Sequence, residues 1–177
     1  EEARITGGRS QFSLHLIPAE EYPPLVAPTG ESLTIGAAEF AEGLRQVVPA
    51  ASTDDSRPIL TGVLLAAEEA GIRLVSTDSY RLAYRDLPGT SLLEQGQQVL
   101  VPSRALQELT RALTDDADVT MVLSEQMASF AVGDLHLSTR LIKGDFPDYE
   151  KLIRDKDWKA LRSEFAQLDP PDLADPA

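Results

Sequence analysis

The stretch Val75-Ser76-Thr77-Asp78-Ser79-Tyr80-Arg81-Leu82-Ala83 predicts two strands joined by a tight turn, and the rest of the chain is organised around it. Strand-like runs over residues 72–76 and 81–85 meet there across a short polar segment. Because Asp78 and Ser79 can hydrogen-bond their own backbone, this segment favours a hairpin turn. The tyrosine, arginine and leucine that follow either bind a partner or simply pack.

One order of elements precedes and includes this hairpin. Residues 32–35 predict a strand, and a helix from residue 37 places Phe40, Leu44, Val47 and Val48 on one face before Pro49 ends it. A polar loop then leads through a proline to a strand over residues 59–66. With the two hairpin strands, this unit is a strand, a helix and three strands.

The same order then repeats. A strand over residues 99–101 leads to a helix over 104–113, with Ser103 as its N-cap and Leu106, Leu109 and Leu113 buried. Three strands follow, over residues 119–123, 128–132 and 135–141, with a tight turn at Gly133-Asp134. Alternating strands and single-striped helices predict an α+β fold, in which two helices pack against two antiparallel sheets.

The N-terminal residues repeat the end of this pattern. Residues 12–17 followed by Tyr22-Pro23 resemble residues 137–142 followed by Phe146-Pro147, and the two Leu-Ile pairs lie 125 positions apart. We therefore expect residues 1–28 to be the closing strands of a preceding domain and a proline-rich connector. We also expect residues 29–153 to form one complete domain and residues 154–177 to form a tail with a short helix followed by a disordered end.

Composition narrows the possible functions. The 177 residues have a formal charge of −13, no cysteine and only two histidines. This charge argues against a generally nucleic-acid-binding or membrane-binding surface, although a few arginines on one face could still act locally. Disulfides and thiolate metal sites are excluded, and no apolar run is long enough to span a bilayer. We expect a cytoplasmic protein with no metal and no cofactor.

An enzyme is a weak alternative. The acid pairs Asp54/Asp55 and Asp115/Asp116 lie in polar connectors without a nearby histidine or cysteine, and so they are expected to be turn residues. Asp78 and Arg81 are expected to form a structural ion pair. Because the sequence has neither a glycine-rich phosphate loop nor a histidine cluster, we predict a protein without catalytic residues.

Four motifs in order give the chain a family resemblance. They are Ser56-Arg57-Pro58-Ile59-Leu60-Thr61-Gly62-Val63, Thr77-Asp78-Ser79-Tyr80-Arg81-Leu82-Ala83, Val101-Pro102-Ser103-Arg104-Ala105-Leu106 and Thr139-Arg140-Leu141-Ile142-Lys143-Gly144-Asp145-Phe146-Pro147-Asp148-Tyr149. Together they resemble the middle domain of the bacterial DNA polymerase sliding clamp, the beta subunit of DNA polymerase III. Residues 10–23 are similar to the end of that family's first domain.

The resemblance implies a processivity factor for DNA replication. In this family, two three-domain subunits form a ring that encircles DNA, with helices toward the phosphate backbone and no chemistry of its own. The implied double-stranded DNA contacts are Arg45, Arg57, Arg104 and Arg111. The implied partner-peptide pocket receives short linear motifs of the replicative polymerase, the clamp loader and repair proteins, and its residues here are Leu60, Thr77, Ser79, Tyr80, Arg81 and Leu82.

The resemblance ends near residue 153. Arg154 stands where the family has a proline of the pocket, and too few residues follow for a third domain. The sequence therefore leaves two interpretations open. One is a fragment of a DNA replication processivity factor, or a short clamp-like protein open to self-association, that tethers the polymerase to DNA and binds partner peptides through a hydrophobic pocket. The alternative is a clamp-derived interaction module that binds clamp-binding peptides without encircling DNA.

Overall fold

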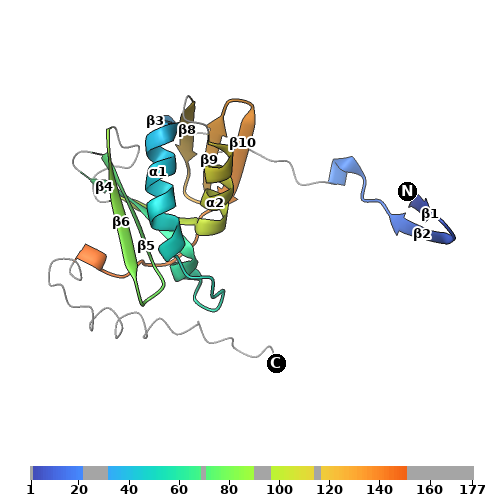
Figure 1. Ribbon diagram of the computed structural model, residues 1–177, viewed down its shortest axis with the longest axis horizontal. Helices are drawn as coiled ribbons and strands as arrows, with labels where there is room; N and C mark the ends of the chain where they lie inside the picture. The colour runs from blue at the N-terminus through green and yellow to red at the C-terminus, as the bar shows by residue number, and fades with distance from the viewer. Residues whose placement is uncertain (1, 22–31, 69–70, 90–96, 114–116, 151–177) are drawn as a thin grey trace.

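The computed structural model describes residues 2–21, 32–68, 71–89, 97–113 and 117–150 of the chain (Figure 1). The elements in chain order are β1 (Glu2–Gly7), β2 (Ser10–His15), η1 (Ala19–Glu21), β3 (Ser32–Gly36), α1 (Ala37–Val47), η2 (Val48–Ala50), η3 (Pro58–Thr61), β4 (Gly62–Glu68), β5 (Gly71–Thr77), β6 (Leu82–Pro88), β7 (Gln98–Pro102), α2 (Ser103–Ala112), β8 (Asp118–Leu123), β9 (Met127–Val132) and β10 (Leu135–Arg140). The predicted tail and the Asp115/Asp116 pair lie outside the described residues.

The two repeated units exchange their first strands. One sheet has the order β10-β9-β8-β3 and the other has the order β6-β5-β4-β7, with every described pairing antiparallel. Strand β3 of the first unit thus completes the sheet of the second, and β7 of the second unit completes the sheet of the first. The predicted α+β fold with two helices and two antiparallel sheets is confirmed, and the exchange makes each sheet depend on both units.

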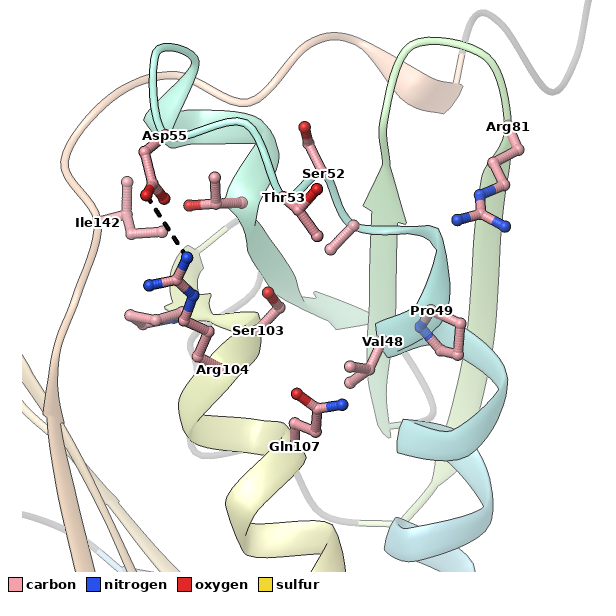
Figure 2. A pocket seen from close by; sticks show the side chains of 13 residues that line it. Val48, Pro49, Ser52, Thr53, Asp55, Arg81, Ser103, Arg104, Gln107 and Ile142 are labelled. Atoms are coloured by element: carbon pink, nitrogen blue, oxygen red, sulfur yellow. Dashed lines mark hydrogen bonds and ion pairs between the residues drawn. The ribbon is translucent and has the colours of Figure 1, made fainter.

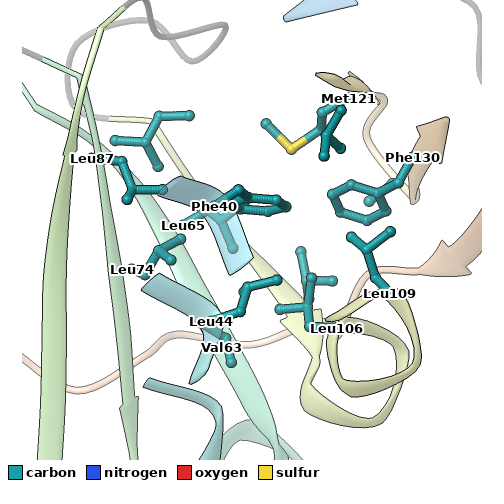
Figure 3. Close-up of a cluster of buried hydrophobic side chains, with 14 of the residues drawn as sticks. Phe40, Leu44, Val63, Leu65, Leu74, Leu87, Leu106, Leu109, Met121 and Phe130 are labelled. Carbon is teal, nitrogen blue, oxygen red and sulfur yellow. The ribbon is translucent and has the colours of Figure 1, made fainter. Parts of the chain in front are cut away.

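One apolar core joins the two units. Helix α1 buries Phe40, Leu44 and Val47 as its spacing predicts, and α2 buries Leu106 and Leu109. Leu113, predicted to be buried, is partly buried and packs against this core. The rings of Phe40 on α1 and Phe130 on β9 stack with their centroids 6.3 Å apart (Figure 3). The core therefore connects a helix of one unit with a strand of the other.

A second apolar cluster places residues 141–150 against the β6-β5-β4-β7 sheet. Phe146 and Tyr149 are buried with Leu64, Val75 and Leu100, and Leu82 packs against the same cluster. The Ile142 N–H donates to the Leu100 carbonyl oxygen at 2.8 Å. The end of the domain is thus held on the sheet beside the β5–β6 hairpin.

Two local predictions were wrong. Residues 59–61 belong to the 3₁₀ turn η3 and not to a strand, because Pro58 lacks an N–H for a ladder and its fixed φ suits the start of a helical turn. The Thr61 hydroxyl closes that turn by donating to the Pro58 carbonyl at 2.7 Å. Ser103 is the first residue of α2 and not its N-cap. Pro102, with extended backbone at φ −54° and ψ 127°, is the N-cap and supplies no side-chain hydrogen bond.

The N-terminal hairpin has the same layout as the last hairpin of the domain. Strands β1 and β2 span residues 2–7 and 10–15, and β9 and β10 span residues 127–132 and 135–140, a constant offset of 125. Both turns contain a glycine at positive φ, 58° for Gly8 and 55° for Gly133. Ile5 is exposed, whereas its equivalent Phe130 is fully buried. The prediction that β1 and β2 close a preceding domain stays a prediction.

Candidate functional site

The turn between β5 and β6 is fixed by its own side chains. One oxygen of the Asp78 carboxylate accepts the N–H groups of Tyr80 at 2.9 Å and Arg81 at 3.0 Å. The Ser79 N–H donates to the Thr77 hydroxyl oxygen at 3.1 Å, and that hydroxyl donates to the Arg81 carbonyl at 2.7 Å. Ser79 has φ +77°, a left-handed conformation that these bonds hold in place.

Groups of this turn stabilise the charged form of the Asp78 carboxyl group. Burial raises the pKa of Asp78, but the two backbone N–H groups and the Arg81 guanidinium outweigh burial, and the pKa is lowered from 3.8. The Arg81 Nε lies 3.0 Å from the second carboxylate oxygen, which confirms the predicted ion pair. The ionised Asp78 carboxylate therefore binds both the backbone of the turn and the side chain of Arg81.

The six predicted peptide-pocket residues divide into an exposed and a buried group. Tyr80 is 74% exposed and the Arg81 side chain 63% exposed, while Leu82 is half-buried against the second apolar cluster. Leu60 and Thr77 are fully buried, and Ser79 is buried as well. In this structure, Tyr80, Arg81 and Leu82 are the accessible residues of the six, which we call the hairpin surface, and the other three are buried.

Arg57 contacts Ser79, next to the hairpin surface. Its Nη1 donates to the Ser79 hydroxyl oxygen at 3.2 Å, and its Nε lies 3.3 Å from an Asp54 carboxylate oxygen. Sequence reasoning grouped Arg57 with the helix arginines as a DNA contact. The structure also connects this side chain to the β5–β6 turn across 22 residues of sequence, and the predicted DNA contact of Arg57 stays a prediction.

The three helix arginines each have a carboxylate neighbour. Arg45 pairs with Glu42 at 3.0 Å and Arg111 pairs with Glu108, both within their own helix, while Arg104 lies 3.5 Å from Asp55. Hydrogen bonds from Arg45 and then Gln46 lower the pKa of Glu42, so this carboxyl is ionised at neutral pH. Helices α1 and α2 have formal charges of −1 and +1, and together they are neutral.

A cavity of about 510 Å³ opens where the C-terminal end of α1 meets the N-terminal end of α2 (Figure 2). Its walls include Val48 and Pro49 after α1, Arg104 on α2, Ile142 from the final segment and Arg81 of the hairpin surface. Sequence reasoning missed this cavity because its walls come from segments that are far apart in the chain. Of the six predicted peptide-pocket residues, Arg81 lines this cavity and also belongs to the hairpin surface.

Within the described ranges, no three His, Cys, Asp or Glu side chains are grouped so that they could hold a metal ion. No helix in that part of the chain is both long and apolar enough to cross a membrane.

Comparison with solved structures assigns this fold to the bacterial sliding clamps. The chain is similar to the DNA polymerase sliding clamp of Bacillus subtilis, with a TM-score of 0.72 and 31% identity over 85% of this chain and 40% of that chain. It is equally similar to the DNA polymerase III subunit beta of Pseudomonas aeruginosa, with a TM-score of 0.72 and 30% identity over 85% and 42% of the two chains.

The sequence match gives the particular family. Residues 34–148 match the central domain of the DNA polymerase III beta subunit, and this chain belongs to that family. The beta sliding clamp of Streptomyces coelicolor is 36% identical over 162 residues, which cover 85% of this chain and 42% of the relative. The beta sliding clamp of Pseudomonas putida is 33% identical over 175 residues, covering 92% and 47%. The predicted resemblance is confirmed, and the chain spans less than half the length of these relatives.

Proposed function

We propose that this chain supplies the middle domain of a non-enzymatic sliding clamp, and that its hairpin surface binds short apolar segments of replication and repair proteins. The relatives are beta sliding clamps, which supports a processivity role. The observation that supports the peptide site most directly is the hairpin surface itself. A rigid turn presents exposed Tyr80 and Arg81 beside half-buried Leu82.

The contacts within the turn refine the role of each residue. Leu82 and the Tyr80 ring offer apolar area to a leucine or aromatic side chain, and Arg81 offers charged donors to peptide carbonyl groups. The Thr77 hydroxyl is already used twice within the turn, and Leu60 has no exposed area. We assign Thr77, Ser79 and Leu60 to support of the surface, with peptide contact made by Tyr80, Arg81 and Leu82.

Peptide titration tests this assignment. A fluorescein-labelled peptide with adjacent leucine and phenylalanine residues is titrated with the protein, and the anisotropy is measured. We expect Tyr80→Ala and Leu82→Asp each to raise Kd by about tenfold or more, the scale of a lost interface anchor. Arg140→Gln, an exposed charge change on the other sheet, should leave Kd unchanged. Tyr80→Ala is the decisive variant, because the Tyr80 side chain is exposed and its removal should leave the fold intact. Unchanged affinity in that variant refutes the assignment.

The DNA role is proposed for an assembled ring. The helix pair is formally neutral, and each helix arginine has a carboxylate neighbour, so this chain alone offers phosphate little net positive charge. In such a ring, Arg45, Arg57, Arg104 and Arg111 contribute weak contacts that add up when several domains surround a duplex. The polymerase, the clamp loader, repair proteins and a cytoplasmic location remain proposals drawn from the family.

The same neutral helix pair favours the alternative function for the chain in isolation. A clamp-derived module would bind partner peptides and leave duplex DNA unbound at low salt. The two functions differ in whether a closed multimer of this chain binds duplex DNA, and a molar mass measured by light scattering identifies such a multimer.

The N-terminal hairpin supports a connection to another clamp domain. Its constant 125-residue offset from β9 and β10, and its exposed Ile5 and Phe12, fit the closing strands of a preceding domain. Ala3 and Ile5 pair with Leu14 and Phe12, so one face of the hairpin is apolar. We propose that this face packs on the core of that domain.

A further inference from the structure

The cavity between the helix ends combines an apolar wall with two guanidinium groups. Val48, Pro49 and Ile142 supply apolar area, and Arg104 and Arg81 reach it from α2 and from the hairpin surface (Figure 2). Ser103 and Gln107 add uncharged polar groups to the α2 side. A ligand that fits this lining has an anionic group beside an aliphatic one.

The cationic side of the cavity can accept a new partner. Arg104 lies 3.5 Å from Asp55, and the two side chains are 78% and 77% exposed. Exposed pairs of this kind contribute little to stability, so Arg104 can exchange Asp55 for a ligand carboxylate at small cost. Guanidinium groups bind carboxylates through two parallel hydrogen bonds, which gives the contact a defined direction.

The composition of the wall favours a peptide over nucleic acid. A sugar–phosphate backbone has no aliphatic side chain to place against Val48, Pro49 and Ile142. Asp55 lines the cavity with a side chain that is 77% exposed, and its charge opposes a polyanion more strongly than a single carboxylate. Arg81 belongs to both the cavity and the hairpin surface, so one extended polypeptide can contact the two in succession.

We infer that this cavity binds an acidic residue next to an aliphatic residue, in the stretch of the partner polypeptide that flanks its apolar segment. The inference rests on the proposed function, because the partner is the one held at the hairpin surface. The cavity extends that contact to the ends of α1 and α2. It predicts a preference among partner peptides that apolar contacts alone do not provide.

The test is amide chemical-shift mapping of the ¹⁵N-labelled full chain. The probes are an acetylated tetrapeptide of alternating aspartate and leucine and the same peptide with asparagine for aspartate. We expect the acidic probe to shift the amides of Val48, Thr53 and Gln107, and the asparagine probe to bind at least about fivefold more weakly. Arg104→Gln should remove the difference between the probes, and Arg140→Gln should keep it.

Each result decides the inference. Equal shifts from both probes, no shifts around the cavity, or displacement of the acidic probe by an equimolar short duplex would overturn it. A labelled peptide with adjacent leucine and phenylalanine, added in a separate titration, reports the hairpin surface through the amides of Tyr80 and Leu82. Loss of those shifts alone refutes the proposed function, whereas loss of the cavity shifts alone refutes the cavity as an acidic-peptide site.

Discussion

At the scale of single residues, Asp78 determines how the candidate site is presented. Its carboxylate accepts two backbone N–H groups and pairs with Arg81. These contacts fix the backbone from which the exposed Tyr80 and Arg81 side chains extend. Ser79 keeps its positive φ between this carboxylate and the Thr77 hydroxyl. The peptide recognition that we propose for Tyr80 and Arg81 therefore depends on Asp78, a residue outside the proposed peptide contact.

This dependence predicts an effect of pH on stability. The pKa of Asp78 in the folded chain is lowered from 3.8, so its contribution is complete above about pH 4 and is lost as the pH falls through the folded-state pKa. Asp78→Asn should lower the free energy of unfolding by about 1 kcal/mol at pH 7, the net value of a lost hydrogen bond. Urea denaturation between pH 2.5 and 7 measures both effects.

The acid-induced loss of stability should be smaller in Asp78→Asn than in the natural chain. Asp54 and Glu42 also have lowered pKa values and remain in both proteins, so the difference between the two pH profiles isolates Asp78. Parallel profiles would show that the Asp78 charge contributes nothing to the turn.

At the scale of elements, the exchange of β3 and β7 couples the two repeated units. Phe40 on α1 and Phe130 on β9 stack at the centre of the core that the units share. Both side chains are almost completely buried. Neither unit can lose its packing without exposing the apolar face of the other, so we expect both to unfold together.

Phe130→Ala tests this coupling. We expect it to lower the free energy of unfolding by about 3 to 5 kcal/mol, because it removes buried area and leaves a cavity against Phe40. Hydrogen exchange should show a matching loss of amide protection in both sheets. Leu135→Ala, at a more exposed position on β10, should change stability by less than about 1 kcal/mol. Loss of protection in only the β10-β9-β8-β3 sheet would contradict the coupling.

Elements with strong periodicity could be predicted from the sequence. The apolar stripe of α1, the strand alternation and the Gly133 turn each report a local preference that the fold keeps. Residues 59–61 could not be assigned correctly, because their apolar character suits a strand and the 3₁₀ turn depends on Pro58. The exchange of β3 and β7 is a long-range pairing that periodicity does not encode.

The sequence predicted which residues of the candidate site lie close together, but it did not predict how deeply each one is buried. The motif places Thr77, Ser79 and Tyr80 close together, but their very different burial depends on the hydrogen bonds of the turn. The contact between Arg57 and Ser79 and the cavity beside α2 join segments distant in sequence. Such junctions require the folded arrangement of the two sheets.

At the scale of the whole molecule, the charge distribution predicts that DNA binding by this chain alone differs from DNA binding by a ring. The formal charge is −13, and the helix pair that the family resemblance directs toward DNA is neutral. The hairpin surface needs no ring to be exposed. We therefore expect the chain by itself to recognise peptides and to bind duplex DNA poorly.

The most direct measurement is a pair of titrations of the full chain, with a labelled leucine–phenylalanine peptide and with a labelled duplex of about 20 base pairs, each at low and moderate salt. We expect saturable peptide binding that changes little with salt, and duplex binding that is weak at low salt and absent at moderate salt. Duplex binding that is tighter than peptide binding and persists at moderate salt, together with no saturable peptide binding, would contradict it.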